Sequence, residues 1–152
     1  MRGFSRVLAA LDGSSRAPGV FEVAANLAER LGARLYLFHA IFVPPEFPAA
    51  AAGGTGVDGD PLVGHLGEQA WRRMRTLAEA RPGVAVEEYL LGSGQPWRAI
   101  LECADRIDAD LIVIGSHGYS RVERMLGTTA AILANRSQRS VLVVHEKPTC
   151  PI

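Results

Sequence analysis

The sequence predicts a layered α/β fold with a mainly parallel sheet and right-handed crossovers. Two observations predict it. Short apolar runs alternate along the chain with longer segments in which apolar residues recur at helical spacing. One of the runs, DLIVI at 110–114, is apolar almost throughout, as is typical of a strand that helices cover on both faces. With 152 residues, the chain has the length of one domain, so these elements can share one sheet.

Five segments have the length and composition of strands. The first, RVLAAL at 6–11, ends at an Asp12-Gly13 turn. The second, RLYLFHAIFV, is rich in aromatic and branched residues. In chain order, we expect the strands at 6–11, 34–43, 84–91 (ended by Gly92-Ser93-Gly94), 110–114 and Ser140–Val144. Ligands of such sheets collect beyond the carboxyl ends of the strands, which the loops after Leu11, Ile41 and Ile114 can reach.

Four segments carry the spacing of helices. Ser14 or Ser15 can cap the first, and Gly32 ends it. Pro61 suits the first turn of the second, which closes at Pro82-Gly83. The third begins at Pro96 and runs to about Ile107, and the fourth covers Thr128 to Arg136. Trp71 and Trp97 fall at apolar positions of their helices, so we expect both in the core, together with the thiol of Cys103.

Residues 1–147 are predicted to form one domain, followed by a short tail at 148–152. Residues 44–60 read PPEFPAAAAGGTGVDGD and lack any period, so we expect a flexible loop that is either a lid or disordered. Sixteen basic residues balance sixteen acidic ones, which does not favour a nucleic-acid partner. The chain has no run of about 18 apolar residues, so no membrane span is expected. Its N-terminus reads as a strand rather than a signal peptide, which favours the cytoplasm.

The strongest chemical signal is a glycine-rich segment. Gly115-Ser116-His117-Gly118 is followed, after eight residues, by Gly127-Thr128-Thr129 at the start of the last helix. Glycines let backbone N–H groups approach a phosphate closely, and the start of a helix favours an anion. Neither a Walker A loop nor a GxGxxG fingerprint is present. On glycine spacing alone, a structural turn and a phosphate loop stay equally open.

An ordered set of motifs resembles the universal stress protein family. It comprises VLAALDGS at the start, LYLFHA in the second strand, GQPWRAI before the third helix, and GSHG…GTT between DLIVIG and SVLVV. The family signature is usually written G-x-x-G, nine residues, G-[ST], whereas eight residues separate Gly118 from Gly127 here. Some nucleotide-binding members also have the shorter gap. The resemblance implies a Rossmann-like, open five-stranded parallel sheet with helices on both faces, and covers almost the whole chain outside 44–60.

The resemblance also implies a site for ATP, with Mg²⁺ arriving on the phosphates. Asp12 corresponds to the acid that lies against the adenosine part, with Ala10 and Leu11 as walls. Ala40 stands where the family holds the adenine edge with backbone atoms. The residues expected near the ribose and phosphates are Gly115, His117, Gly118, Gly127, Thr128 and Thr129. A homodimer would form through Ser140–Val144.

Single residues leave further alternatives open. His39 follows an apolar run and is expected to be a core or edge histidine with its hydrogen bonds satisfied. His117 can lie beside a phosphate or ribose, or face solvent, and Arg121 and Arg124 can neutralise phosphate charge or cover the surface. His65 and His145 have no ligand spacing with another His, Cys or acid, so no protein metal site is expected.

The sequence therefore favours an ATP-binding regulatory module for stress survival, with at most slow hydrolysis. No carboxylate or lysine stands clearly placed for phosphoryl transfer. Two alternatives remain: a homodimeric interaction module that binds no nucleotide, and a small enzyme of the same architecture. The second lacks an SGGxDS pattern and a flavin-type phosphate loop.

Overall fold

The computed structural model describes residues 3–42, 61–116 and 128–146. It contains a five-stranded sheet in the order β3-β2-β1-β4-β5, in which every pair of neighbours is parallel. The strands are β1 (Arg6–Leu11), β2 (Arg34–Ile41), β3 (Val86–Ser93), β4 (Leu111–Gly115) and β5 (Ser140–Val144). The predicted five-stranded parallel α/β fold is confirmed.

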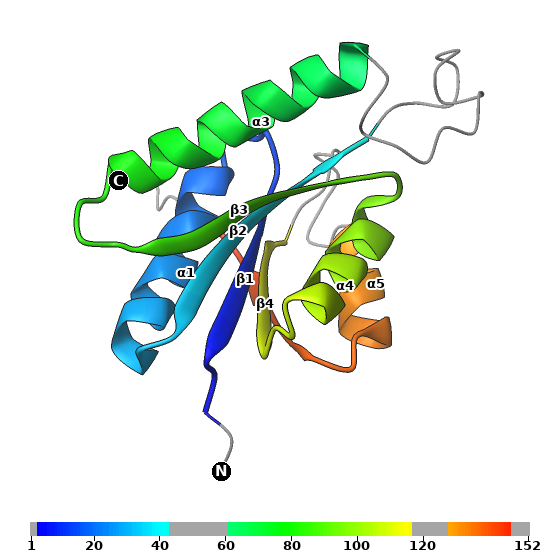
Figure 1. Cartoon of the computed structure of the whole chain (residues 1–152). Coiled ribbons are helices and arrows are strands. Elements are labelled where there is room, and N and C mark those ends of the chain that lie inside the picture. The colour runs from blue at the N-terminus through cyan, green and yellow to red at the C-terminus, as the bar shows by residue number, and fades with distance from the viewer. Residues whose placement is uncertain (1–2, 43–60, 117–127, 147–152) are drawn as a thin grey trace, which may run out of the picture.

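Helices cover both faces of the sheet (Figure 1). The helices are α1 (Ala17–Leu31), α3 (Pro61–Glu79), α4 (Pro96–Arg106) and α5 (Thr128–Arg136). α1 and α3 lie on one face, and α4 and α5 on the other. The chain builds the sheet outward from β1 through β2 to β3, then crosses back to place β4 on the other side of β1. The order of the strands therefore reverses between β1 and β4.

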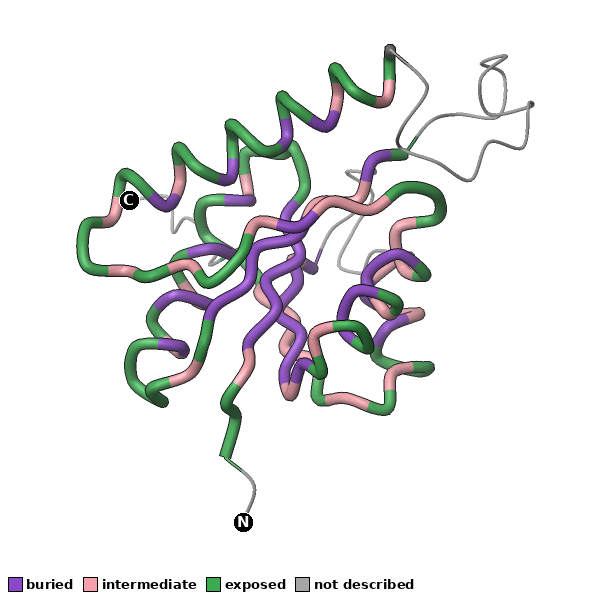
Figure 2. The backbone as a smooth tube through the Cα atoms, viewed as in Figure 1, coloured by how far each residue is buried: buried purple, intermediate pink, exposed green. Residues whose placement is uncertain are grey.

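The alternation of side chains along each strand divides the core into two layers. In β1, Val7, Ala9 and Leu11 pack toward α1 and α3, whereas Leu8 and Ala10 pack toward α4 and α5. Figure 2 shows the central strands buried along most of their length, while the edge strand β3 is only partly covered. Cys103 is a free, buried thiol, 3% exposed, as predicted.

Several predicted boundaries agree with the structure. The first strand, the last strand and the last helix have the predicted bounds. Gly32 ends α1 in the left-handed conformation, with φ of 63° and its N–H directed to the carbonyls of Ala28 and Glu29. The predicted loop at 44–60 and the tail at 148–152 lie outside the described residues.

The third strand is displaced from its predicted place. It covers Val86–Ser93 rather than 84–91, because its pairing with β2 begins at Val86 and continues to the Ile41–Ser93 pair. Gly92 therefore belongs to the strand, and the chain turns at Gly94, where φ is 97°. A Cβ on Gly92 would lie 2.8 Å from the ring of Phe38, so this position requires glycine for close packing rather than for a turn. β4 is displaced by one residue, to Leu111–Gly115.

Two further expectations are wrong. Neither Ser14 nor Ser15 caps α1, since the residue before its first turn is Arg16 and no side chain caps it. Trp71 is 38% exposed, because it lies beside the buried stripe of α3 and rests on Tyr89 of the edge strand. The guanidinium of Arg75 also lies over the indole of Trp71, 4.8 Å from the ring centre, in a cation–π contact. Trp97 is partly buried and packs against the core layer under α4 and α5.

Candidate functional site

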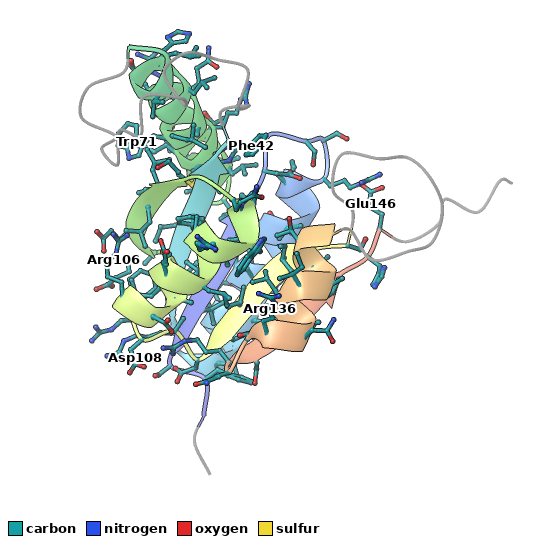
Figure 3. The ribbon with its side chains drawn as sticks, turned by 90° about the vertical axis from the view of Figure 1, so that its right-hand side faces the viewer. Phe42, Trp71, Arg106, Asp108, Arg136 and Glu146 are labelled. Carbon is teal, nitrogen blue, oxygen red and sulfur yellow. The ribbon has the colours of Figure 1, made fainter. Side chains whose placement is uncertain are left out.

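A hollow of about 100 Å³ lies at the carboxyl ends of β1 and β4, where the strand order reverses. Its residues come from segments that are far apart in the sequence and meet at this edge of the sheet. Figure 3 shows Phe42 and Glu146 at this end of the molecule, with Asp108 at the opposite end. The lining residues are Ala10, Leu11, Asp12, Arg16, Val20, Phe38, His39, Ala40, Phe42, Pro96, Ile100, Ile114, Gly115, Thr129 and Ala130.

Six of the ten residues expected at a nucleotide site line this one hollow. They are Ala10, Leu11, Asp12, Ala40, Gly115 and Thr129. Thr128 begins α5, but its side chain is not described. His117, Gly118 and Gly127 lie outside the described residues, as do Arg121 and Arg124.

The walls of the hollow are apolar for a reason that follows from strand register. Ala10 of β1 lies opposite Phe38 of β2 and Ile114 of β4. The three side chains project on the same face of the sheet, where Ile100 of α4 and Ala130 of α5 close the layer. The site is therefore a continuation of the core that is left open at one end of the sheet.

The backbone of Ala40 offers a hydrogen-bonding edge beside this apolar wall. β2 pairs with β1 only as far as His39, but pairs with β3 as far as Ile41. The carbonyl of Ile41 accepts a hydrogen bond from the N–H of Gly94 at 3.2 Å, so Ile41 directs its polar groups to the β3 side. Because successive residues of a strand direct these groups to opposite edges, Ala40 directs its groups to the β1 side, where its C=O faces the space beyond the end of β1.

Asp12 stands at the rim of the hollow and organises the turn after β1. Its Oδ1 accepts hydrogen bonds from the backbone N–H of Ser14 at 3.0 Å and from the Ser14 hydroxyl at 2.5 Å. This is the local hydrogen-bonding pattern that Asp favours in turns. Both bonds use the same oxygen, so Oδ2 can accept a hydrogen bond from a ligand hydroxyl.

His39 is half-buried beside Asp12. Burial lowers the pKa of its imidazole below the usual 6.5, and the Asp12 carboxylate and the Leu11 backbone offset that effect only in part. The guanidinium of Arg73 lowers the pKa further. The ring is therefore mostly neutral near neutral pH and can both donate and accept a hydrogen bond.

A second hollow, of about 330 Å³, lies on the other face of the sheet between the start of α1 and α3. Leu11, Asp12 and His39 border both hollows. Arg72 and Arg73 of α3 stand at the second one, and Arg72 pairs there with Glu68 at 2.5 Å. Ala10, Ala40, Gly115 and Thr129 line only the first hollow, which is therefore the candidate functional site.

Sequence reasoning missed several lining residues, above all Arg16, Phe38, Phe42 and Pro96. Phe38 could have been found, since pairing the two predicted strands in parallel from their starts, Arg6 opposite Arg34, places it opposite Ala10. Arg16 gives no such signal, because only the fold of the turn after Asp12 brings its side chain to the hollow. His39 was expected as a core or edge residue, and it also borders the site.

Among the described residues, no group of three or more His, Cys, Asp or Glu side chains could hold a metal ion. None of the helices described has both the length and the apolar character needed to cross a membrane.

Comparison with known proteins gives consistent matches over the length of the chain. Residues 3–145 match the model of the universal stress protein family. Universal stress protein A homolog 2 of Coxiella burnetii is 32% identical, over 97% of this chain and 99% of that protein. A universal stress protein of Thermus aquaticus is 34% identical, over 98% of this chain and 96% of its own length.

A solved structure, described as a universal stress protein in complex with cAMP, shares the fold. It has a TM-score of 0.66 and 28% sequence identity, and the match covers 96% of this chain and all of that one. The family match, the two relatives and the fold agree, and this chain belongs to the universal stress protein family.

Proposed function

We propose that this chain binds an adenine nucleotide in the hollow between β1 and β4, with ATP as the expected ligand. One observation carries the proposal: six residues expected from the family motifs, drawn from four separate segments, line a single hollow at the switch point of the sheet. Parallel α/β sheets bind their ligands at this place. The solved relative with bound cAMP, at 28% identity, adds support for an adenine nucleotide.

The chemistry of the hollow suits the adenine base. The side chains of Ala10, Phe38 and Ile114 offer an apolar surface for a flat ring. Beside them, Ala40 directs its backbone C=O, an acceptor, to the space beyond the end of β1. An adenine edge presents an amino donor that can pair with this carbonyl.

The sugar and phosphates are assigned to the other rim. Asp12 is placed to accept a hydrogen bond from a ribose hydroxyl, since its Oδ2 is not used in the turn. Gly115 and Thr129 stand on the side where β4 ends and α5 begins, and the first turn of a helix favours phosphate. His117, Gly118, Gly127 and Thr128 keep their expected roles as phosphate neighbours, on sequence grounds.

Regulation by binding, rather than fast catalysis, fits this site. Of the described side chains that line the hollow, the titratable ones are Asp12, Arg16 and His39, and none of them is a lysine. The carboxylate of Asp12 is engaged with Ser14, and the expected place of Asp12 is against the adenosine part. We therefore expect at most slow ATP hydrolysis, with any Mg²⁺ held mainly by the phosphates.

A homodimer through Ser140–Val144 remains part of the proposal. β5 lies at one edge of the sheet, and its two apolar faces are only partly buried. An open edge strand with apolar side chains is a template for pairing with a second copy. The other edge strand, β3, carries the exposed acids Glu87 and Glu88, which discourage such pairing.

The test is to release small molecules from the purified chain with acid, identify them by mass spectrometry, and titrate the emptied protein with ATP and adenosine by calorimetry. Asp12→Asn should weaken adenosine binding about fivefold to tenfold, because a charged acceptor becomes a neutral one that still supports the Ser14 turn. Asp108→Asn, at the opposite end of the sheet, is the matched control and should leave binding unchanged. Absence of nucleotide, with no thermal shift in millimolar ATP, would instead favour the interaction module that binds no nucleotide.

A further inference from the structure

Among the described residues that line the hollow, Arg16 is the one that carries a guanidinium group. It is the residue that precedes α1, and its side chain is 29% exposed. The hollow also includes Asp12, Gly115 and Thr129, so Arg16 shares it with residues assigned to the sugar and phosphates. A permanent positive charge in this position is matched to an anionic part of the ligand.

The turn after β1 fixes where the Arg16 side chain begins. Asp12 holds Ser14 through both its backbone N–H and its hydroxyl, as described above. The Ser14 hydroxyl in turn accepts a hydrogen bond from the backbone N–H of Arg16 at 3.2 Å. The Ser14 carbonyl accepts one from the N–H of Ala17, also at 3.2 Å. A short chain of hydrogen bonds therefore runs from the carboxylate of Asp12 to the backbone of Arg16.

The Arg16 side chain already contacts an anion, the carboxylate of Glu146. The distance from Arg16 Nε to Glu146 Oε2 is 3.6 Å, and the Glu146 side chain is 62% exposed. Glu146 follows the end of β5, where Val144 pairs with Gly115 and accepts a hydrogen bond from the N–H of Ser116 at 2.9 Å. The carboxylate therefore belongs to a segment that runs beside the first glycine of the motif.

This ion pair is weak enough to be exchanged. Exposed pairs of this kind contribute little to stability, because water and salt screen the two charges. A phosphate carries more charge than a carboxylate and suits the two-pronged hydrogen bonding of a guanidinium. The first turn of α1 contains no acidic residue that would repel it.

We propose that Arg16 binds the phosphate chain of the nucleotide and that Glu146 forms an ion pair with Arg16 when the phosphate is absent. This inference rests on the proposed function, because it assigns a further residue to the same site. Nucleotide binding then exchanges one ion pair for another and releases the Glu146 carboxylate from the start of α1. The end of β5, which precedes Glu146 in the chain, is thereby coupled to the phosphate content of the ligand.

Calorimetric titration of the full chain with ATP and with adenosine, at one fixed ionic strength, tests the proposal. Arg16→Gln should weaken ATP binding about tenfold, as expected for the loss of charge-assisted hydrogen bonds, and change adenosine binding less than about twofold. Arg16→Lys keeps the charge but not the fork, so its ATP affinity should be intermediate. Glu146→Gln removes the competing anion and should tighten ATP binding about twofold to threefold. Arg30→Gln, at the far end of the same helix, is the control for lost charge.

The outcomes separate this inference from the proposed function. A wild-type chain that binds neither ATP nor adenosine would refute the function and, with it, the role of Arg16. A wild-type chain that binds ATP, with the same ratio of ATP to adenosine affinity in Arg16→Gln, would refute the role of Arg16 alone. Unchanged or weaker ATP binding in Glu146→Gln would refute the exchange.

Discussion

The two ends of the sheet differ in which groups their polar side chains hydrogen-bond. At the amino end, Ser5, Arg6, Asp105, Asp108, Asp110 and Arg139 hydrogen-bond to one another or to backbone groups of the neighbouring strands and loops. Among the described residues at the carboxyl end, the side chains of Asp12 and Ser14 form hydrogen bonds within their own turn. The nearby Arg16 has an exposed ion pair at 3.6 Å. One end is tied together by its charges, and the other surrounds a hollow.

This difference separates stability from binding in one small fold. Polar groups that satisfy one another across elements hold the strands in register, and nothing is left over for a ligand. Polar groups that bond only locally stay available at the rim of an apolar space, which is how ligand sites are commonly built. We therefore expect substitutions at the amino end to change the free energy of unfolding, and substitutions at the carboxyl end to change ligand affinity.

Arg139→Ala should have the largest effect on stability and is the strongest test of this difference between the two ends of the sheet. Its guanidinium joins Asp105 at 3.0 Å, Asp108 at 3.3 Å and the carbonyl of Ala109, and its side chain is only 22% exposed. Loss of these charge-assisted bonds should lower the free energy of unfolding by about 2 kcal/mol in urea titrations, with ATP affinity unchanged. Arg98→Ala, on the exposed surface of α4, serves as the control. A loss of ATP affinity in Arg139→Ala would mean that the two ends are not independent.

The fold could be predicted from the sequence because its signals are local. The bounds of α5 and β5 follow from the glycine-threonine start of the helix and from the apolar run SVLVV. The place of β3 could not be predicted, since its register depends on an irregularity opposite Leu35 and Tyr36 of another strand. The exposure of Trp71 could not be predicted either, because helical periodicity does not show which side of α3 packs against an edge strand.

The candidate site was only partly predictable, for a related reason. Motif positions such as Asp12 and Gly115 follow strands, so topology alone brings them to one edge. Arg16 follows no strand, and its approach to the hollow depends on the hydrogen bonds of one turn. Ser14 reads as a helix cap in the sequence, yet its hydroxyl serves the turn that precedes the helix.

Asp110→Asn sharpens the comparison through pH. Hydrogen bonds from the Ser5 hydroxyl and backbone N–H, with help from the Arg6 N–H and charge, hold the pKa of this carboxyl below its usual 3.8. A lowered folded-state pKa gives stability that is present above pH 3.8 and is lost as the pH falls through the folded-state pKa. At neutral pH, the variant should lose about 1 kcal/mol, given the exposure of these groups, and this loss should shrink in acid. A constant difference between the variant and wild type from neutral pH to pH 3 would contradict the role of the charge.

His39→Gln should have the smallest effect and tests the carboxyl end by the same measurement. The pKa of His39 is below 6.5 in the folded chain, mainly because the ring is buried, and Asp12 and Arg73 are the charged groups that influence it. The unfolded chain therefore takes up the proton first, so the wild-type free energy of unfolding falls as the pH drops from 6.5 through the folded-state pKa. Glutamine cannot titrate, and the variant should show a flatter profile over that interval in urea titrations at matched ionic strength. A profile as steep as that of wild type would mean that another group causes this pH dependence. Protonation of His39 at the hollow would then not lower the stability of the folded chain.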